Sequence, residues 1–265
     1  MHFRSVSLVL LFLILVGLRQ PASAQQTDTP PLTPSAPLCA KEVVQNLVRR
    51  NLERAHALRA YQGTRIYRAE YHGFPGTRSA EMVVDVKYQS PATKEFTIQS
   101  ASGSKLIIDK VFKKLLQSEE EALGPEMQRR TALNSDNYDF TLIGYESTPT
   151  GPMYVLSVEP RTKDKFLYRG RIWVDAEDFA VARIQAEPAK NPSFWTRNTE
   201  VEHVYAKVSD FWLPAYNHSI SKIRLGGRAD FTIEYKDYQV TGASPGSNLP
   251  TLGAFPSAEA SRAQR

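Results

Sequence analysis

The residues of this chain that could carry acid–base or metal chemistry are its histidines and one cluster of carboxylates. Four histidines lie beyond the first 24 residues: His56, His72, His203 and His218. They never form a close pair and have polar or charged neighbours, which favours solvated side chains over metal ligands. Asp175, Glu177 and Asp178 could bind a cation, but they lie between two strand-like segments, where a polar hairpin turn is the simpler interpretation. With no His-Glu-x-x-His motif, phosphate-binding loop or cysteine pair, the sequence predicts no metal site, no cofactor and no catalytic residue.

Two other groups of side chains could contact a ligand. Arg169 and Arg171 project on the same face of a predicted strand, where they are either solvated or meet a lipid headgroup or an acidic partner. Phe194 and Trp195 lie in a proline-punctuated loop. They either cap the core or line the rim of a ligand opening, and the sequence leaves both interpretations open.

The first 24 residues are typical of a secretory signal peptide. A basic opening with Arg4 precedes an apolar run at residues 6–18, and the small residues Ala22-Ser23-Ala24 follow. The run has about 13 residues, whereas a membrane span needs about 20. We expect cleavage after Ala24 and export to the periplasm. Cys39 has no cysteine partner and lacks the small preceding residues of a lipid-modification site.

Composition predicts one ordered domain between two polar segments. Residues 25–39 and 241–265 are rich in Pro, Ser, Thr and Gln, so we expect a disordered linker and a flexible tail. Residues 40–240 carry continuous patterning without an internal linker, which indicates a single domain. Removal of Arg4 and Arg19 lowers the net charge from +5 to +3. This mild charge, spread along the chain, does not indicate a nucleic-acid partner.

Hydrophobic periodicity predicts an α+β domain that is mainly antiparallel β. Apolar residues recur at helical spacing in residues 40–58 and 104–123, with a weaker helical piece at 126–133. Period-2 alternation marks strands on either side of the 73–76 turn, around Phe96, and at 138–147, 152–159, 165–175, 178–187, 200–209, 212–225 and 228–239. About ten strands joined by short turns predict a curled, half-open β-barrel whose open side is covered by the helices.

Several predicted strands are apolar on both faces, for example at residues 153–156, so both faces need a cover. The interior is either a filled core or a hydrophobic cavity suited to an acyl chain. Alternation supplies the candidate cavity residues: Met82, Val84, Val86, Phe96, Ile98, Tyr154, Leu156, Phe166, Tyr168 and Ile172. Helical spacing supplies the candidate lid residues: Ile107, Ile108, Val111, Phe112 and Leu115.

The order of elements resembles the LolA/LolB-like family of periplasmic lipoprotein carriers. Residues 170–184 and 210–216 are similar to segments of outer-membrane lipoprotein-sorting proteins, and the resemblance covers residues 40–240. It implies a non-enzymatic chaperone that shields lipoprotein or lipid acyl chains during sorting to the outer membrane. It also implies inner- and outer-membrane transport proteins as partners, with the chain a monomer. A lipid-sensing regulatory module and a secreted hydrolase are the alternatives.

Overall fold

The computed structural model describes residues 38–91, 93–191, 196–224 and 226–242. The predicted signal peptide, the candidate rim residues Phe194 and Trp195, and nearly all of the predicted linker and tail lie outside the described residues. Their roles and the domain boundaries therefore stay predictions. In the described residues, no helix is long and apolar enough to cross a membrane.

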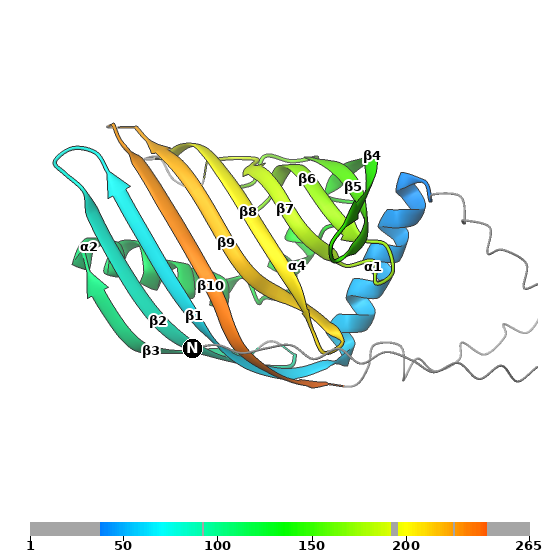
Figure 1. The fold of residues 1–265 in the computed structure, drawn as a ribbon, viewed down its shortest axis with the longest axis horizontal. Helices are drawn as coiled ribbons and strands as arrows, with labels where there is room; N and C mark the ends of the chain where they lie inside the picture. Colours follow the sequence, from blue (N-terminus) through cyan, green and yellow to red (C-terminus); the bar gives the residue numbers. More distant parts are fainter. Residues whose placement is uncertain (1–37, 92, 192–195, 225, 243–265) are drawn as a thin grey trace, which may run out of the picture. The chain divides into compact units, whose positions relative to one another are not determined.

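Within this part of the chain, ten strands form one antiparallel sheet that does not close (Figure 1). They are β1 (Leu58–His72), β2 (Arg78–Gln89), β3 (Thr93–Gly103), β4 (Tyr138–Thr148), β5 (Gly151–Pro160), β6 (Tyr168–Asp175), β7 (Val181–Pro188), β8 (Thr196–Val208), β9 (Phe211–Ile223) and β10 (Arg228–Gly242). Their order is β3-β2-β1-β10-β9-β8-β7-β6-β5-β4, so β3 and β4 are the edges. The predicted fold class, mainly antiparallel β in a curled half-open barrel with helices, is confirmed.

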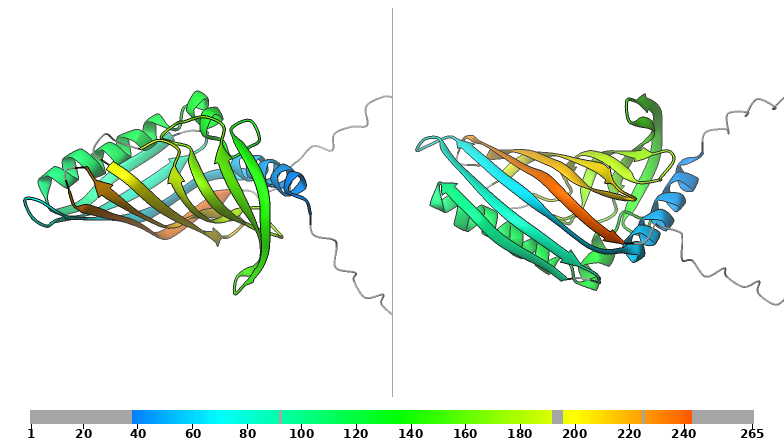
Figure 2. Two further views of the ribbon diagram at one scale, coloured as in Figure 1. Left: turned by 90° about the horizontal axis from the view of Figure 1, so that it is seen from above. Right: turned by 60° about the horizontal axis from the view of Figure 1, so that its bottom comes forward.

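The helices are α1 (Ala40–Ala57), α2 (Lys105–Ile107), α3 (Lys113–Glu121) and α4 (Pro125–Thr131). A π-helical turn, Ile108–Phe112, joins α2 to α3, and we call residues 105–121 the lid segment. Gly124 precedes Pro125, which occupies the first turn of α4, where its missing N–H costs no helical hydrogen bond. Figure 2 shows the lid segment lying along one face of the curled sheet. We call this covered face the inner face.

Two apolar clusters attach the helices to the inner face. The α1 cluster joins α1 to β4–β7: Val43, Val44, Leu47, Tyr138, Tyr154, Leu156, Val158, Leu167, Ile172, Val174, Ile184, Ala186 and Ala189. The lid cluster joins the lid segment to β1, β2 and β10: Tyr67, Ala80, Met82, Val84, Val86, Ile107, Phe112, Leu116 and Ile233. Each fully buried Leu, Ile, Phe or Met side chain stabilises the fold by about 1.5–3 kcal/mol. The core is thus divided between the two helical covers.

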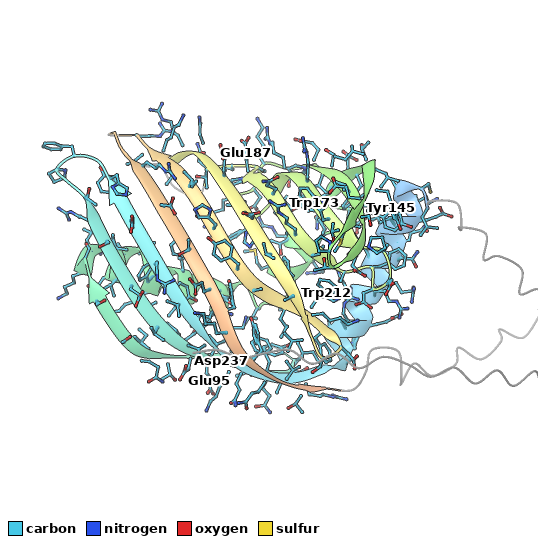
Figure 3. All side chains as sticks on the ribbon, viewed as in Figure 1. Glu95, Tyr145, Trp173, Glu187, Trp212 and Asp237 are labelled. Carbon is cyan, nitrogen blue, oxygen red and sulfur yellow. The ribbon has the colours of Figure 1, made fainter. Side chains whose placement is uncertain are left out.

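A third, smaller cluster explains the strands that are apolar on both faces. Met153, Val155, Trp173 and Ala182 are buried together, and Trp212 packs against them. The cover comes from side chains rather than from a helix. The guanidinium of Arg183 lies 5.0 Å from the ring centre of Trp173, and the Trp173 indole donates a hydrogen bond to Glu146 at 3.0 Å. Trp173 and Trp212 are labelled in Figure 3.

Candidate ligand-binding site

Strand pairing fixes which side chains share the inner face between the two clusters. Directly opposed residues of an antiparallel sheet project on the same side. The pairing gives one row across six strands: Ile184, His203, Asn217, Ile233, Tyr67 and Met82. Ile184 belongs to the α1 cluster and Ile233 to the lid cluster. The imidazole of His203 and the amide of Asn217 therefore lie on the inner face, between two apolar regions.

A pocket of about 360 Å³ lies between the second half of α1 and the inner face of β6–β9. Its walls are mainly apolar and aromatic, with these residues among them: Leu58, Leu133, Tyr168, Ile184, Tyr205 and Leu213. Burial raises the pKa of Tyr168 and of Tyr205, so both phenols stay protonated. The pocket, which we call the α1 pocket, offers mainly apolar surface and neutral phenols, with Asn51 and the guanidinium of Arg54 at its α1 side.

Apolar contacts and two hydrogen bonds hold α1 over this pocket. Val43 and Leu47 are fully buried against the sheet. Toward the other end, the Arg54 guanidinium donates hydrogen bonds to the carbonyl oxygens of Asp178 at 2.8 Å and Phe179 at 2.9 Å. These bonds tie α1 to the turn between β6 and β7. Periodicity predicted the helix, but it did not indicate that the helix would cover a pocket.

The candidate lid residues divide between buried and exposed positions. Ile107 and Phe112 are buried in the lid cluster, and Ile108 packs against it while partly exposed. Val111 is 39% exposed and Leu115 is 38% exposed. The lid segment covers the sheet as expected, but only part of its predicted stripe does the packing. A ligand contact through Val111 or Leu115 stays a prediction.

The end of the lid segment is held by a charged group that the sequence analysis missed. Arg65 of β1 donates two hydrogen bonds to the Glu119 carboxylate, at 2.6 and 3.0 Å, and Lys94 of β3 donates a third at 2.6 Å. Arg65 is only 4% exposed and also lies 5.0 Å from the ring centre of Tyr235. We call Arg65, Lys94 and Glu119 the lid ion cluster. The sequence could have indicated this group, because Arg65 is two residues from Tyr67 on the same strand and so projects on the same face.

Opposing effects set the charge of this cluster. Burial raises the pKa of Glu119, but the hydrogen bonds and charges of Arg65 and Lys94 outweigh burial, so the pKa lies below its ordinary value. Burial likewise opposes the charge of Arg65, and Glu119 outweighs it, so the pKa of Arg65 is raised. Arg65 and Glu119 are therefore both charged at neutral pH, and their charges are paired with one another.

The structure brings the candidate cavity residues together in two groups. Met82, Val84 and Val86 are fully buried in the lid cluster. Tyr154, Leu156 and Ile172 are buried in the α1 cluster. Phe96 packs against the lid cluster, and Tyr168 lines the α1 pocket. Ile98 is 42% exposed and Phe166 is 37% exposed, so neither lies in a closed cavity. Their contact with a ligand stays a prediction.

The polar candidates form turns and surface pairs. The Asp175 carboxylate accepts hydrogen bonds from the backbone amides of Glu177 at 3.0 Å and Asp178 at 2.7 Å, the arrangement of a polar turn. Within the described residues, no group of three or more His, Cys, Asp or Glu side chains could hold a metal ion. His218 pairs with Asp230 at 2.9 Å. The sequence has one Gly-x-Ser-x-Gly match, at 242–246, and its serine lies outside the described residues.

No protein-family model matches the chain, and no curated protein matches it. Solved structures are similar to it at low identity. A DUF1329 family protein from Desulfovibrio piger is 11% identical with a TM-score of 0.38, over 76% of this chain and 92% of that one. A putative outer membrane lipoprotein-sorting protein domain from Vibrio parahaemolyticus is 9% identical with a TM-score of 0.36, over 80% and 95%. A LolA superfamily protein from Nitrosomonas europaea is 10% identical with a TM-score of 0.34, over 81% and 96%. The latter two carry the names of the group that the sequence resembles.

Proposed function

We propose that this protein is a non-enzymatic periplasmic carrier that binds the acyl chains of lipids or lipoproteins on the inner face of its sheet. The observation that carries the proposal is the α1 pocket, whose walls include Leu58, Ile184 and Leu213. Moving an acyl chain from water into such surroundings is favourable by about 0.8 kcal/mol for each buried CH₂ group. The predicted signal peptide and the sequence resemblance to lipoprotein carriers agree with this function.

Loading begins in this proposal at α1. An acyl chain that extends beyond the pocket must separate α1 from β4–β7, because the α1 cluster fills the space beside the pocket. The contacts of Val43 and Leu47 are apolar and non-directional, so the acyl chain replaces them with equivalent contacts. Arg54 keeps the far end of the helix attached through its bonds to the turn.

A tryptophan placed in the pocket tests the proposal. Ala55 is exposed on α1 and also lines the pocket, so Ala55→Trp fills the pocket without disturbing the core. We expect Ala55→Trp to weaken binding of a fluorescent long-chain fatty acid by at least about tenfold. His56→Trp is the matched control, because His56 is exposed and does not line the pocket. Equal binding by both variants contradicts a site in the α1 pocket.

Two further measurements separate the alternatives. Native mass spectrometry of protein prepared from the periplasm should find bound lipid, and a protein that binds neither fatty acid nor phospholipid is not a lipid carrier. Transfer of a labelled lipoprotein to outer-membrane vesicles should follow loading. Binding without transfer under any condition would instead indicate a lipid-sensing module.

A further inference from the structure

A line of polar, uncharged side chains runs along the middle of the inner face. It consists of Thr199 and His203 on β8 and Asn217, Ser219 and Ser221 on β9. Asn217 opposes His203, and positions 217, 219 and 221 alternate onto the same face. The hydroxyl groups of Thr199 and Ser221 lie 2.8 Å apart. We call these five residues the polar stripe, which extends about 14 Å from Asn217 to Ser221 at ~3.4 Å per residue.

Apolar surface borders the polar stripe on both sides. On the β7 side, Ile184 opposes His203 and Ala186 opposes Val201, and both belong to the α1 cluster. On the β10 side, Ile233 opposes Asn217 and Phe231 opposes Ser219, next to the lid cluster. Across the strands, the inner face therefore changes from apolar to polar and back to apolar, and Val201, between Thr199 and His203, is an apolar residue within the polar stripe on β8. The polar stripe departs from the apolar pattern on either side of it, and the pairs Thr199–Ser221 and Asn217–His203 offset part of the cost of placing polar groups there.

The polar stripe offers hydrogen-bond donors without positive charge. The Asn217 amide nitrogen lies 2.9 Å from His203 Nδ1 and 3.3 Å from Nε2. Burial lowers the pKa of His203, which keeps its imidazole neutral with one N–H. An asparagine amide has two N–H groups, of which this contact uses one. The remaining N–H and O–H groups suit a carbonyl oxygen, whereas a carboxylate or phosphate would lie there without a counter-charge.

We propose that the polar stripe binds the ester linkages of a neutral lipid core carrying two acyl chains, one chain directed to each apolar cluster. The proposal rests on the lipid-carrier function and narrows its ligand from any acyl chain to a diester lipid. Ester carbonyl oxygens accept hydrogen bonds from His203 and Asn217. The α1 pocket, next to Ile184, takes one chain, and the surface beside Phe231 takes the other.

A comparison of ester and ether lipids tests this proposal. Dioctanoylglycerol has two ester carbonyls, and the matched dioctyl ether of glycerol has none. In displacement of a fluorescent fatty acid, the wild-type protein should bind the diester about tenfold more tightly than the diether. Asn217→Leu should reduce that preference to about threefold or less. Ser219→Ala, which removes only a hydroxyl group and leaves the neighbouring apolar contacts in place, should also reduce it.

His218→Leu is the matched control, because His218 follows Asn217 on β9 and points to the opposite face. It should keep the full preference for the diester. Equal wild-type affinity for diester and diether overturns the polar-stripe proposal while leaving the carrier function standing. A wild-type protein that binds neither glycerolipid nor the fluorescent fatty acid overturns both proposals. If the preference for the diester persists in both Asn217→Leu and Ser219→Ala, the ester groups bind elsewhere and the polar-stripe proposal is overturned.

Discussion

Removal of one charge from the lid ion cluster should measurably loosen the lid segment. Glu119→Gln keeps the size of the side chain but removes the carboxylate that accepts two bonds from Arg65 and one from Lys94. Arg65, whose side chain is 5% exposed, then keeps its positive charge without a carboxylate beside it. The buried guanidinium dominates the cost, because its desolvation is no longer compensated.

The magnitude follows from the burial of the three groups. Breaking a buried ion pair from one side costs about 3–5 kcal/mol, whereas an exposed pair is worth about 0–1 kcal/mol. Glu119 is 33% exposed in its side chain, so solvent screens part of the interaction. We therefore expect Glu119→Gln to lower the free energy of unfolding by about 2–3 kcal/mol. For a domain of this size, the midpoint of thermal unfolding falls by about 4–12 °C.

Urea unfolding and hydrogen exchange of residues 105–121 measure the effect. The matched control is Glu120→Gln, which removes the same charge from the neighbouring, exposed position. If the free energies of unfolding of the two variants differ by less than about 0.5 kcal/mol, the ion cluster does not hold the lid segment.

The lid ion cluster also determines how stability changes with pH. Because the pKa of Glu119 is lowered by folding, its contribution is present above about pH 4.5 and is lost as the pH falls through the lower folded value. The free energies of unfolding of the wild type and of Glu119→Gln should therefore converge as the pH falls.

The remaining predictions concern α1 and the polar stripe. Leu47 is fully buried in the α1 cluster, so Leu47→Ala should lower the free energy of unfolding by about 2–5 kcal/mol, whereas Leu52→Ala, at a position 58% exposed, should change it by less than about 0.5 kcal/mol. Similar values for the two in urea unfolding contradict the packing of α1. Burial lowers the pKa of His203 below 6.5, so the unfolded chain binds this proton more readily and stability falls as the pH drops through that range. His203→Gln should reduce this loss between about pH 7.5 and pH 5, and an unchanged slope would show that His203 is solvated.

Most of the elements could be predicted from the sequence because each depends on a local repeat. The alternation around Tyr67 and Met82 gave the first hairpin, and the 3.6-residue spacing of Val44, Leu47 and Val48 gave α1. The pairing of β1 with β10 could not be predicted in the same way. It joins Tyr67 to Ile233 across most of the chain, and no local pattern encodes which distant strand becomes the neighbour.

The lid segment shows how local geometry altered a correct helix prediction. Regular helical spacing groups Val111 with Phe112 on one apolar stripe. The π-helical turn, Ile108–Phe112, contains more residues per turn than an α-helix, and it shifts the angular positions of the residues that follow. The buried residues Ile107, Phe112 and Leu116 are spaced five and then four apart. Val111 and Leu115, which follow Ile107 at a regular spacing of four, are 39% and 38% exposed. A prediction based on a fixed period of 3.6 residues cannot detect one extra residue in a helical turn.

The candidate site was harder to predict than the fold because it depends on exceptions to the apolar pattern. Alternation selects residues such as Met82 and Leu156, which are the most deeply buried and fill the two clusters. The chemically distinct positions are inward-facing residues that break the pattern, namely Arg65, His203 and Asn217. Each lies on an inward-facing row of the sheet and is polar.

These exceptions divide the inner face into parts with different roles. Arg65, Lys94 and Glu119 neutralise one another, and Glu119 belongs to the lid segment, so their charges hold a cover in place. Because these three charges are paired with one another, they offer little to an ionic ligand. The polar stripe has donors but no charge, and the α1 pocket has mainly apolar walls with neutral phenols and Arg54 at its α1 side. Attachment of the lid segment thus depends on ions, and hydrogen bonding along the polar stripe is left to neutral groups.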